Sequence, residues 1–265
     1  SVYLRQRRYD KAVRELRKAV AATPDDAETQ GLLGRALYFK GDYDTARVCL
    51  ERAAQAARPD PLGLASLGDL FERLGRVADA REAFQRALAA LGPSGAAGGA
   101  ERSETIDADV KIAARLGLAR LALAAGDVQA ARTEALQALE RDPARPDILL
   151  TLGRVYASAQ QWDDALAAYD RALVAAASGA GQRGQLMLFD RRGLLEEALR
   201  AALRAGATAR AGNYATSLLA DAPEHPDALA ALARAAAEAG ELERAQSFVE
   251  RALAAADSLE ARLAA

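Results

Sequence analysis

The sequence repeats itself with a period of 34 residues. The segments LLGRALYFKGDYDTARVCLERA (32–53) and SLGDLFERLGRVADAREAFQRA (66–87) align without a gap and carry glycine and alanine at the same places. A repeat of this length is typical of folds in which a small unit buries its apolar side only against its neighbours. The period therefore predicts a stack of equivalent units. One alanine column runs through the chain: Ala12, Ala46, Ala80, Ala131, Ala165, Ala211 and Ala245.

Each repeat has the pattern of two amphipathic helices joined by a turn. Apolar residues spaced three, four and seven apart, such as Tyr43, Ala46, Leu50 and Ala53, define one side of a helix. Alanine, the residue with the highest helix propensity, supplies 69 of the 265 positions. The turn column, where glycine tolerates a left-handed backbone, contains Gly41, Gly75, Gly126, Gln160, Gly206 and Gly240. The residues expected to fill the seam beside the turn are Tyr9, Tyr43, Val77, Val128, Trp162 and Leu242.

These columns resemble those of the tetratricopeptide repeat family. The resemblance rests on a small residue in the first helix, the turn, two alanine columns with a bulky residue between them, and a closing proline. It implies an all-α fold, a right-handed superhelical α-solenoid of stacked helical hairpins with about seven repeats. The fifth full unit departs from the pattern, with Leu199 and Leu218 at small-residue positions. The residues assigned to close helix packing are Gly34, Ala46, Gly68, Ala80, Ala131, Gly153, Ala165 and Ala245.

The repeat register predicts a single solenoid over residues 1–265. Its units are about 1–25, which is partial, 27–60, 61–92, 112–145, 146–177, 192–225 and 226–259. Insertions at about 92–107 and 178–185 are rich in glycine and serine and predict loops. Apolar periodicity resumes at Ile106 and Leu186, so the helices after both insertions are expected to be longer than the others. The chain begins inside a unit with no leader pattern, and we interpret it as a segment of a longer protein.

The resemblance also indicates where a ligand would lie, because members of the family usually bind along a concave groove lined by the first helices. Arginine dominates one column of those helices, and its planar group suits carboxylates. The opposing interpretation is that 31 arginines in the chain simply occupy exposed positions, where their stems cover apolar surface. The family's asparagine and lysine carboxylate clamp is absent from this sequence. The candidate groove residues are Arg35, Tyr38, Asp69, Arg120, Arg154, Arg200 and Arg234.

Composition narrows the classes of function. The net charge of −2 gives no global attraction to nucleic acid or to an anionic membrane, and no apolar run is long enough to cross a bilayer. One cysteine and one histidine do not make a structural zinc site, so we expect no metal and no cofactor. No nucleophile and base stand in a catalytic arrangement, and no glycine-rich phosphate loop follows a strand. We therefore expect a protein that is not an enzyme.

The sequence favours a non-catalytic protein–protein interaction scaffold. The expected partner is a protein or an acidic peptide held in the arginine-lined groove, within a larger chain or complex. Two other functions fit the same residues: a regulatory or substrate-docking arm of a larger enzyme, and a periplasmic factor for secretion or envelope assembly. The composition resembles bacterial coding and is that of a soluble protein, and it leaves both the cytoplasm and the periplasm open as compartments.

Overall fold

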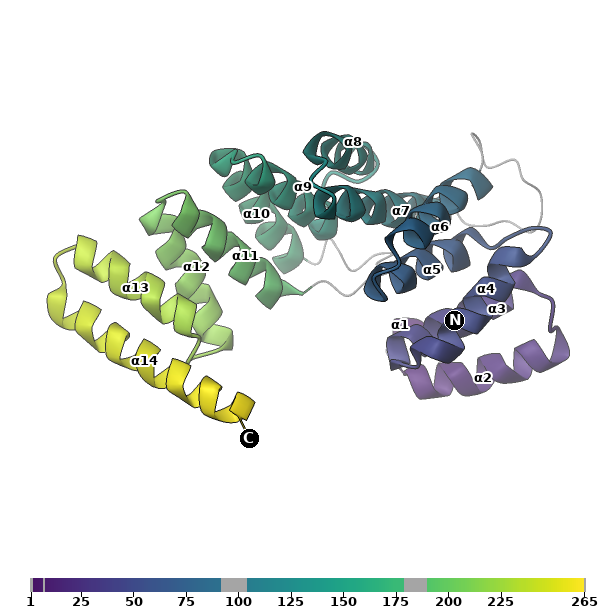
Figure 1. Cartoon of the computed structure of the whole chain (residues 1–265), viewed down its shortest axis with the longest axis horizontal. Coiled ribbons are helices and arrows are strands. Elements are labelled where there is room, and N and C mark those ends of the chain that lie inside the picture. Colours follow the sequence, from purple (N-terminus) through teal and green to yellow (C-terminus); the bar gives the residue numbers. More distant parts are fainter. Residues whose placement is uncertain (1, 7, 92–103, 179–189, 265) are drawn as a thin grey trace. The chain divides into compact units, whose positions relative to one another are not determined.

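The computed structural model describes residues 2–6, 8–91, 104–178 and 190–264 (Figure 1). These residues form helices and turns, with no strand among them, so the expected all-α helical repeat fold is confirmed. The helices are α1 (Val2–Arg5), α2 (Tyr9–Ala22), α3 (Ala27–Lys40), α4 (Tyr43–Gln55), α5 (Pro61–Arg73), α6 (Val77–Ala90), α7 (Glu104–Ala124), α8 (Val128–Leu139), α9 (Pro146–Ser158), α10 (Trp162–Ala177), α11 (Arg191–Arg204), α12 (Thr208–Asp221), α13 (Pro226–Glu238) and α14 (Leu242–Ala264).

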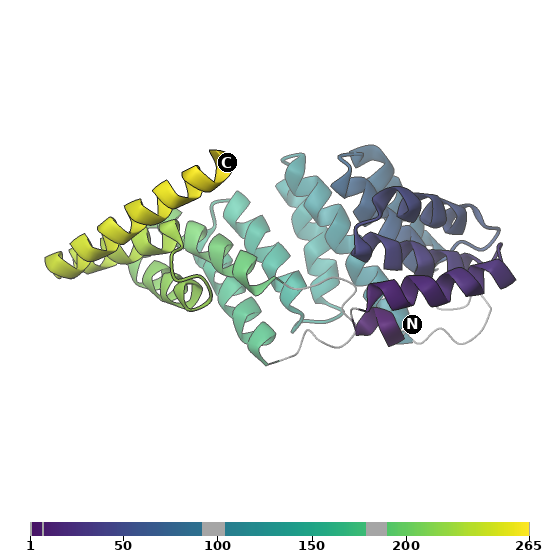
Figure 2. The same cartoon turned by 90° about the horizontal axis from the view of Figure 1, so that it is seen from below.

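The helices divide into two compact units. Unit 1 holds α1 to α8 and ends at Asp142, and unit 2 begins at Pro143 and holds α9 to α14. Within each unit, consecutive helices pair as hairpins, and each hairpin packs on the next. Figure 2 shows one such hairpin in unit 2, with the long helix α14 beside α13. The prediction of one continuous solenoid across residues 1–265 stays a prediction.

Small residues bring the two helices of each hairpin close together. The first alanine column is buried throughout, from Ala12 to Ala245. On the facing helix, a Cβ atom built on Gly68 would lie 2.6 Å from Phe84 Cδ1, and one built on Gly153 would overlap the ring of Tyr169. Glycine at these positions is therefore what lets the bulky residue of the second helix reach the first, and the close contact secures dispersion energy along the seam.

The turns adopt the backbone that the glycine column predicts. Gly41, Gly75, Gly126, Gly206 and Gly240 end first helices with φ between 69° and 92°. Gln160 takes the same place between α9 and α10 with φ 58°, a left-handed conformation that costs free energy in a residue with a Cβ atom. The backbone of the hairpin turn thus overrides side-chain preference at this one position of the column.

Helices α3 and α5 each begin after an aspartate that caps the helix. Asp60 accepts a hydrogen bond from the Gly63 backbone N–H at 2.7 Å, and Pro61 follows as the first helical residue. Asp26 caps α3 in the same way, accepting from the Thr29 N–H at 2.9 Å. These side chains satisfy N–H groups that have no partner within the helix and so fix where α3 and α5 begin.

The structure corrects three details of the sequence prediction. Helix α7 begins at Glu104, inside the expected insertion 92–107, and is 21 residues long, as expected of a lengthened helix. Helix α11 starts at Arg191 and has 14 residues, like its neighbours, while residues 179–185 of the second insertion and Leu186 lie outside the described residues. Val77 and Leu242 do not fill the seam, because 45% and 71% of their surfaces are exposed.

Candidate functional site

A column of charged residues follows the buried small or apolar residue of each first helix. In α3, α5 and α9 the buried residue is a glycine, and in α7, α11 and α13 it is Ala119, Leu199 and Ala233. Burial of that residue fixes the rotation of the helix, so its neighbour lies at the border of the packed side. The column residues are Arg35 on α3, Asp69 on α5, Arg120 on α7, Arg154 on α9, Arg200 on α11 and Arg234 on α13.

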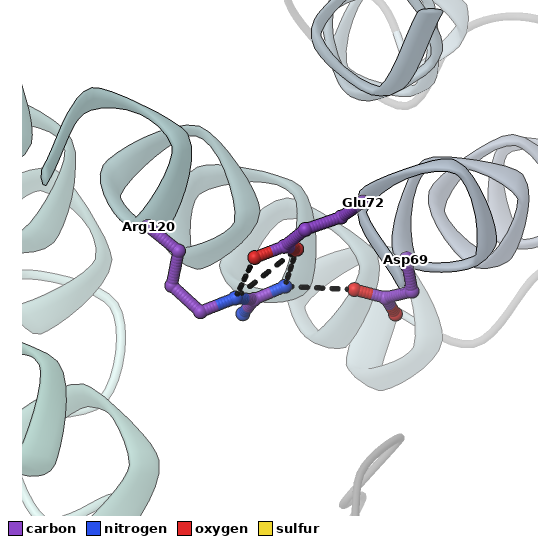
Figure 3. A network of polar contacts seen from close by, with 3 residues as sticks. All are labelled: Asp69, Glu72 and Arg120. Atoms are coloured by element: carbon purple, nitrogen blue, oxygen red, sulfur yellow. Dashed lines mark hydrogen bonds and ion pairs between the residues drawn. The ribbon is translucent and has the colours of Figure 1, made fainter. Parts of the chain in front are cut away.

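In unit 1 two residues of the column, Asp69 and Arg120, belong to one ion-pair network (Figure 3). The Arg120 guanidinium donates from Nε and Nη2 to Glu72, at 2.9 and 2.6 Å, and from Nη2 to Asp69 Oδ1 at 2.9 Å. Helices α5 and α7 are in direct contact here, which brings the three side chains together. The predicted groove residues Asp69 and Arg120 therefore meet each other.

Burial governs the electrostatics of this network. It raises the pKa of the Asp69 carboxyl to about 6, against the lowering effect of the Arg120 charge. Burial opposes the charge on Arg120 as well, but the hydrogen bond to Glu72 and the charge of Asp69 raise its pKa above the ordinary value. The network is a structural clamp between two repeats, and Arg120 already holds two carboxylates of its own chain.

Two other predicted groove residues of unit 1 lie in crowded surroundings. Burial lowers the pKa of Arg35, and nearby acidic charges, Asp69 among them, counteract it. The Tyr38 ring packs edge-on against Phe39 at 5.4 Å and tilted against Tyr43 at 5.7 Å between ring centroids. Burial raises the pKa of the Tyr38 hydroxyl. Tyr38 thus belongs to an aromatic cluster rather than to a bare groove wall.

Unit 2 has a hollow of about 290 Å³ between α9, α10 and α11. Arg154 of α9 donates to Glu197 of α11 from Nε at 2.8 Å and from Nη2 at 2.5 Å. This pair is more open than the one in unit 1, with 36% of the Arg154 side chain exposed. Two predicted groove residues, Arg154 and Arg200, meet in this hollow. Its lining is Arg154, Ala157, Ser158, Trp162, Tyr169, Glu197, Arg200, Ala201 and Arg204.

The comparisons with known proteins agree with this architecture. Models of the tetratricopeptide repeat match residues 3–70, 116–181 and 202–265, which together make up most of the sequence. The chain belongs to the tetratricopeptide repeat family. No curated protein sequence matches it.

Solved structures with this fold include several tetratricopeptide repeat proteins at low identity. PilW, described as a widely conserved type IV pilus biogenesis factor, aligns with a TM-score of 0.67 and 18% identity, covering 87% of this chain and 93% of PilW. PilF of Pseudomonas aeruginosa gives 0.61 and 15%, with coverages of 85% and 90%. A chain of the APC/C hetero-tetramer Cut9–Hcn1 gives 0.68 and 13%, covering 93% of this chain and 43% of that one. At these identities the likeness shows the fold.

Asp69, Arg120, Arg154 and Arg200, which the tetratricopeptide repeat columns predict as groove residues, lie in the two clusters described above. Arg234 does not line the hollow of unit 2 and pairs with Glu238 on its own helix at 2.9 Å. Glu72 and Glu197, the acids that engage the arginines, were missed, although each stands three residues from a column position on the same helix face. Trp162, interpreted as core, is half-buried and lines the hollow. A search of adjacent first helices for residues of opposite charge would have identified the two acids.

Metal-binding residues do not gather in the part of the chain that the structure describes, where no group of three histidine, cysteine or acidic side chains could hold an ion. His225 lies 3.4 Å from Glu196, and Cys49 is buried within the core of unit 1. Among the described helices, none combines the length and apolar character needed to cross a membrane.

Proposed function

We propose that this chain is a non-catalytic scaffold that holds a segment of a partner protein against the first helices of its repeats. The family supports this proposal, because tetratricopeptide repeat proteins generally mediate protein–protein interaction. Repeats of this kind present one residue per hairpin at regular spacing, which matches the extended or helical backbone of a bound segment. The enzyme-arm and envelope-assembly hypotheses stay predictions, since no described residue favours either.

The observation that carries the proposal is the charged column on the first helices. Arg154, Arg200 and Arg234 keep side chains at least partly exposed, next to positions whose burial fixes their place. Each guanidinium offers a planar fork of donors that can bind a carboxylate through two hydrogen bonds, so less conformational freedom is lost per hydrogen bond formed than with lysine. We therefore propose an arginine-lined binding face with a preference for acidic segments.

The charged column of unit 1 differs from that of unit 2. An acidic partner at Arg120 would have to displace Glu72 or Asp69, which hold its Nε and Nη2 groups at 2.6 to 2.9 Å. Charge-assisted hydrogen bonds of this kind between partly buried groups are the strong class. The column of unit 2 is therefore the better place for an acidic contact.

Site-specific photo-crosslinking tests the proposal. A photoreactive phenylalanine analogue replaces Arg234 on the first helix α13, and a control variant carries it at Val174 on the second helix α10, where 70% of the surface is exposed. Irradiation in the source cells should give a discrete crosslinked species from position 234 and none from position 174. Equal crosslinking from both positions, or from 174 alone, would overturn the assignment to the first helices.

A further inference from the structure

The ion-pair network of unit 1 has a counterpart in unit 2 at the same places of the repeat. Helices α5 and α7 begin units in the same register as α9 and α11, so their residues can be matched one by one. The column arginine of the later helix is kept, while the two acids of the earlier helix are replaced. The equivalent residues are Asp69 and Arg154, Glu72 and Ala157, and Arg120 and Arg200.

The replacement leaves Arg200 without the carboxylates that its equivalent holds. Among the described residues, Arg200 makes one hydrogen bond, from Nε to the Glu196 carbonyl oxygen at 3.2 Å. Arg204, one turn further along α11, is exposed and has no carboxylate partner in the same described part of the chain. The carboxylate that lines the hollow, Glu197, is engaged by Arg154. The hollow thus contains three guanidinium groups and one carboxylate.

The hollow also has space where the unit 1 site is filled. Ala157 and Ser158 line it at the positions that Glu72 and Arg73 occupy in α5. A volume of about 290 Å³ accommodates a carboxylate side chain together with bridging waters, each of which takes roughly 30 Å³ in the liquid. Trp162 supplies an aromatic wall against which the aliphatic part of such a side chain can pack.

We propose that this hollow binds the side-chain carboxylate of a glutamate or aspartate from a partner segment, on Arg200 and Arg204, in the place that Glu72 takes on Arg120. The inference rests on the proposed scaffold function and names its chemistry at one site. The reason for a side-chain carboxylate is internal to the molecule, because that group occupies the equivalent position in unit 1. Charge agrees, since the lining carries a surplus of two positive charges.

Glu197 lines the hollow and also lowers the affinity of the hollow for an acidic side chain. Its carboxylate neutralises Arg154 and stands in the same hollow as the incoming acid, so it repels that acid. Replacing it by glutamine removes the repulsion while keeping the shape of the side chain. The Glu197→Gln variant should therefore bind an acidic segment more tightly than the wild-type chain, by roughly threefold to tenfold.

Random peptides serve as ligands in the test, so no partner has to be chosen beforehand. A phage-displayed library of random linear peptides is selected on the immobilised full chain and, in parallel, on an Arg200→Gln/Arg204→Gln double variant. A matched control, Arg210→Gln/Arg244→Gln, loses the same charge from exposed positions on α12 and α14 outside the hollow. Selected peptides should be enriched in glutamate or aspartate on the wild-type chain and on the control, and should lose that enrichment on the double variant.

Binding is then measured with the selected peptide, made with a blocked C-terminus, and with its glutamine-substituted version. Trp162 is the single tryptophan of the chain and lines the hollow, so its fluorescence reports occupancy directly. We expect at least a tenfold loss of affinity for the glutamine peptide and for the double variant, with an unchanged circular dichroism spectrum. Tight binding only when the peptide's C-terminus is free would overturn the side-chain assignment, as would equal affinity for both peptides.

The outcomes separate this inference from the proposed function. Peptides that bind the first helices equally well with and without acidic residues would leave the scaffold standing and remove the carboxylate site. Selection of no peptide from the library, with crosslinking spread over both helix faces, would remove both. A weaker acidic peptide with Glu197→Gln would contradict the role given to that residue.

Discussion

In both units an aromatic ring of a second helix packs against the first helix of its hairpin, but the units differ at one position on the next first helix. In unit 1 the Phe84 ring lies against Gly68 of its own hairpin and Gly117 of the next first helix, where an added Cβ would overlap the ring at either place. In unit 2 the equivalent ring, Tyr169, lies against Gly153. The position of Gly117 is taken there by Glu197. A glycine at this position lets the next first helix approach the ring, whereas in unit 2 the glutamate at the same position lines the hollow.

The same comparison explains the electrostatics. In unit 1 the one arginine of the network is paired with two acids of the same chain. Unit 2 lines its hollow with three arginines and one acid, so positive charge is left over. The closed network keeps its arginine engaged within the chain, whereas the open one leaves positive charge for the partner proposed above. Variants that exchange or remove these features should separate the two roles.

The largest effect is expected from transferring the unit 2 residue into unit 1. Gly117→Glu would force a side chain into the Phe84 ring and bury a charge, so it should destabilise the chain by about 3 kcal/mol or more. Urea unfolding followed by circular dichroism measures the change. The reverse substitution, Glu197→Gly, should cost only about 1 kcal/mol through a lost ion pair and a helical glycine. Similar losses from both would contradict the comparison.

Removing the arginine of each cluster should also have unequal effects. Arg120→Ala leaves Asp69 and Glu72 close together without a counter-charge, and the free energy of unfolding should fall by about 3 kcal/mol. Arg154→Ala removes a more exposed pair and should cost about 1 kcal/mol or less. The urea midpoints of the two variants measure these two losses of stability. A larger loss for Arg154→Ala would show that the hollow, and not the closed network, carries stability.

The closed network should give unit 1 a distinct dependence on pH. The folded pKa of Asp69 is about 6, above its ordinary value of 3.8, so the folded chain holds a proton that the unfolded chain releases between these values. The stability from this group is therefore fully present below pH 3.8 and is lost as the pH rises through 6, a change of about 2 to 3 kcal/mol. Asp69→Asn should remove this part of the pH profile measured by urea unfolding. An identical profile in the variant would show that Asp69 titrates normally.

The smallest effect concerns the turn beside the hollow. Gln160 holds a φ of 58° where the other turns have glycine, so Gln160→Gly should relieve strain and stabilise the chain by about 0.5 to 1 kcal/mol. The thermal midpoint should rise by a few degrees, while Gly75→Ala at the equivalent turn of unit 1 should lower it. A fall in the midpoint with Gln160→Gly would show that the glutamine side chain contributes contacts that outweigh the strain.

The sequence was sufficient for features that depend on local spacing. The alanine column from Ala12 to Ala245 is buried and the turn column has positive φ, including at Gln160, because both are set by repeating contacts within a hairpin. The capping role of Asp60 before Pro61 follows from the same local rules. After the insertions, α7 is longer than the other first helices, as expected, but it begins inside the predicted loop 92–107, and α11 is not lengthened, because no repeat column anchors the start of either helix.

The pairing of the arginines could not be predicted in the same way. Whether Arg120 faces solvent or Glu72 depends on which residues the next repeat brings alongside it, and the column pattern does not contain that information. The hollow in unit 2 arises from the absence of large side chains at Ala157 and Ser158. A pattern search marks residues that are present, whereas a cavity depends on the volume that the neighbours leave unfilled.

The position of Phe84 has a consequence for how the repeats unfold. Its ring is enclosed by glycines from two hairpins, so the α5–α6 hairpin completes its core only when α7 is in place. Displacement of α7 exposes the Phe84 ring of the α5–α6 hairpin, which couples the two hairpins into one cooperative unit in hydrogen exchange. Backbone amides of α5 and α7 should therefore exchange together and slowly, while those of α9 and α11 should exchange at separate rates.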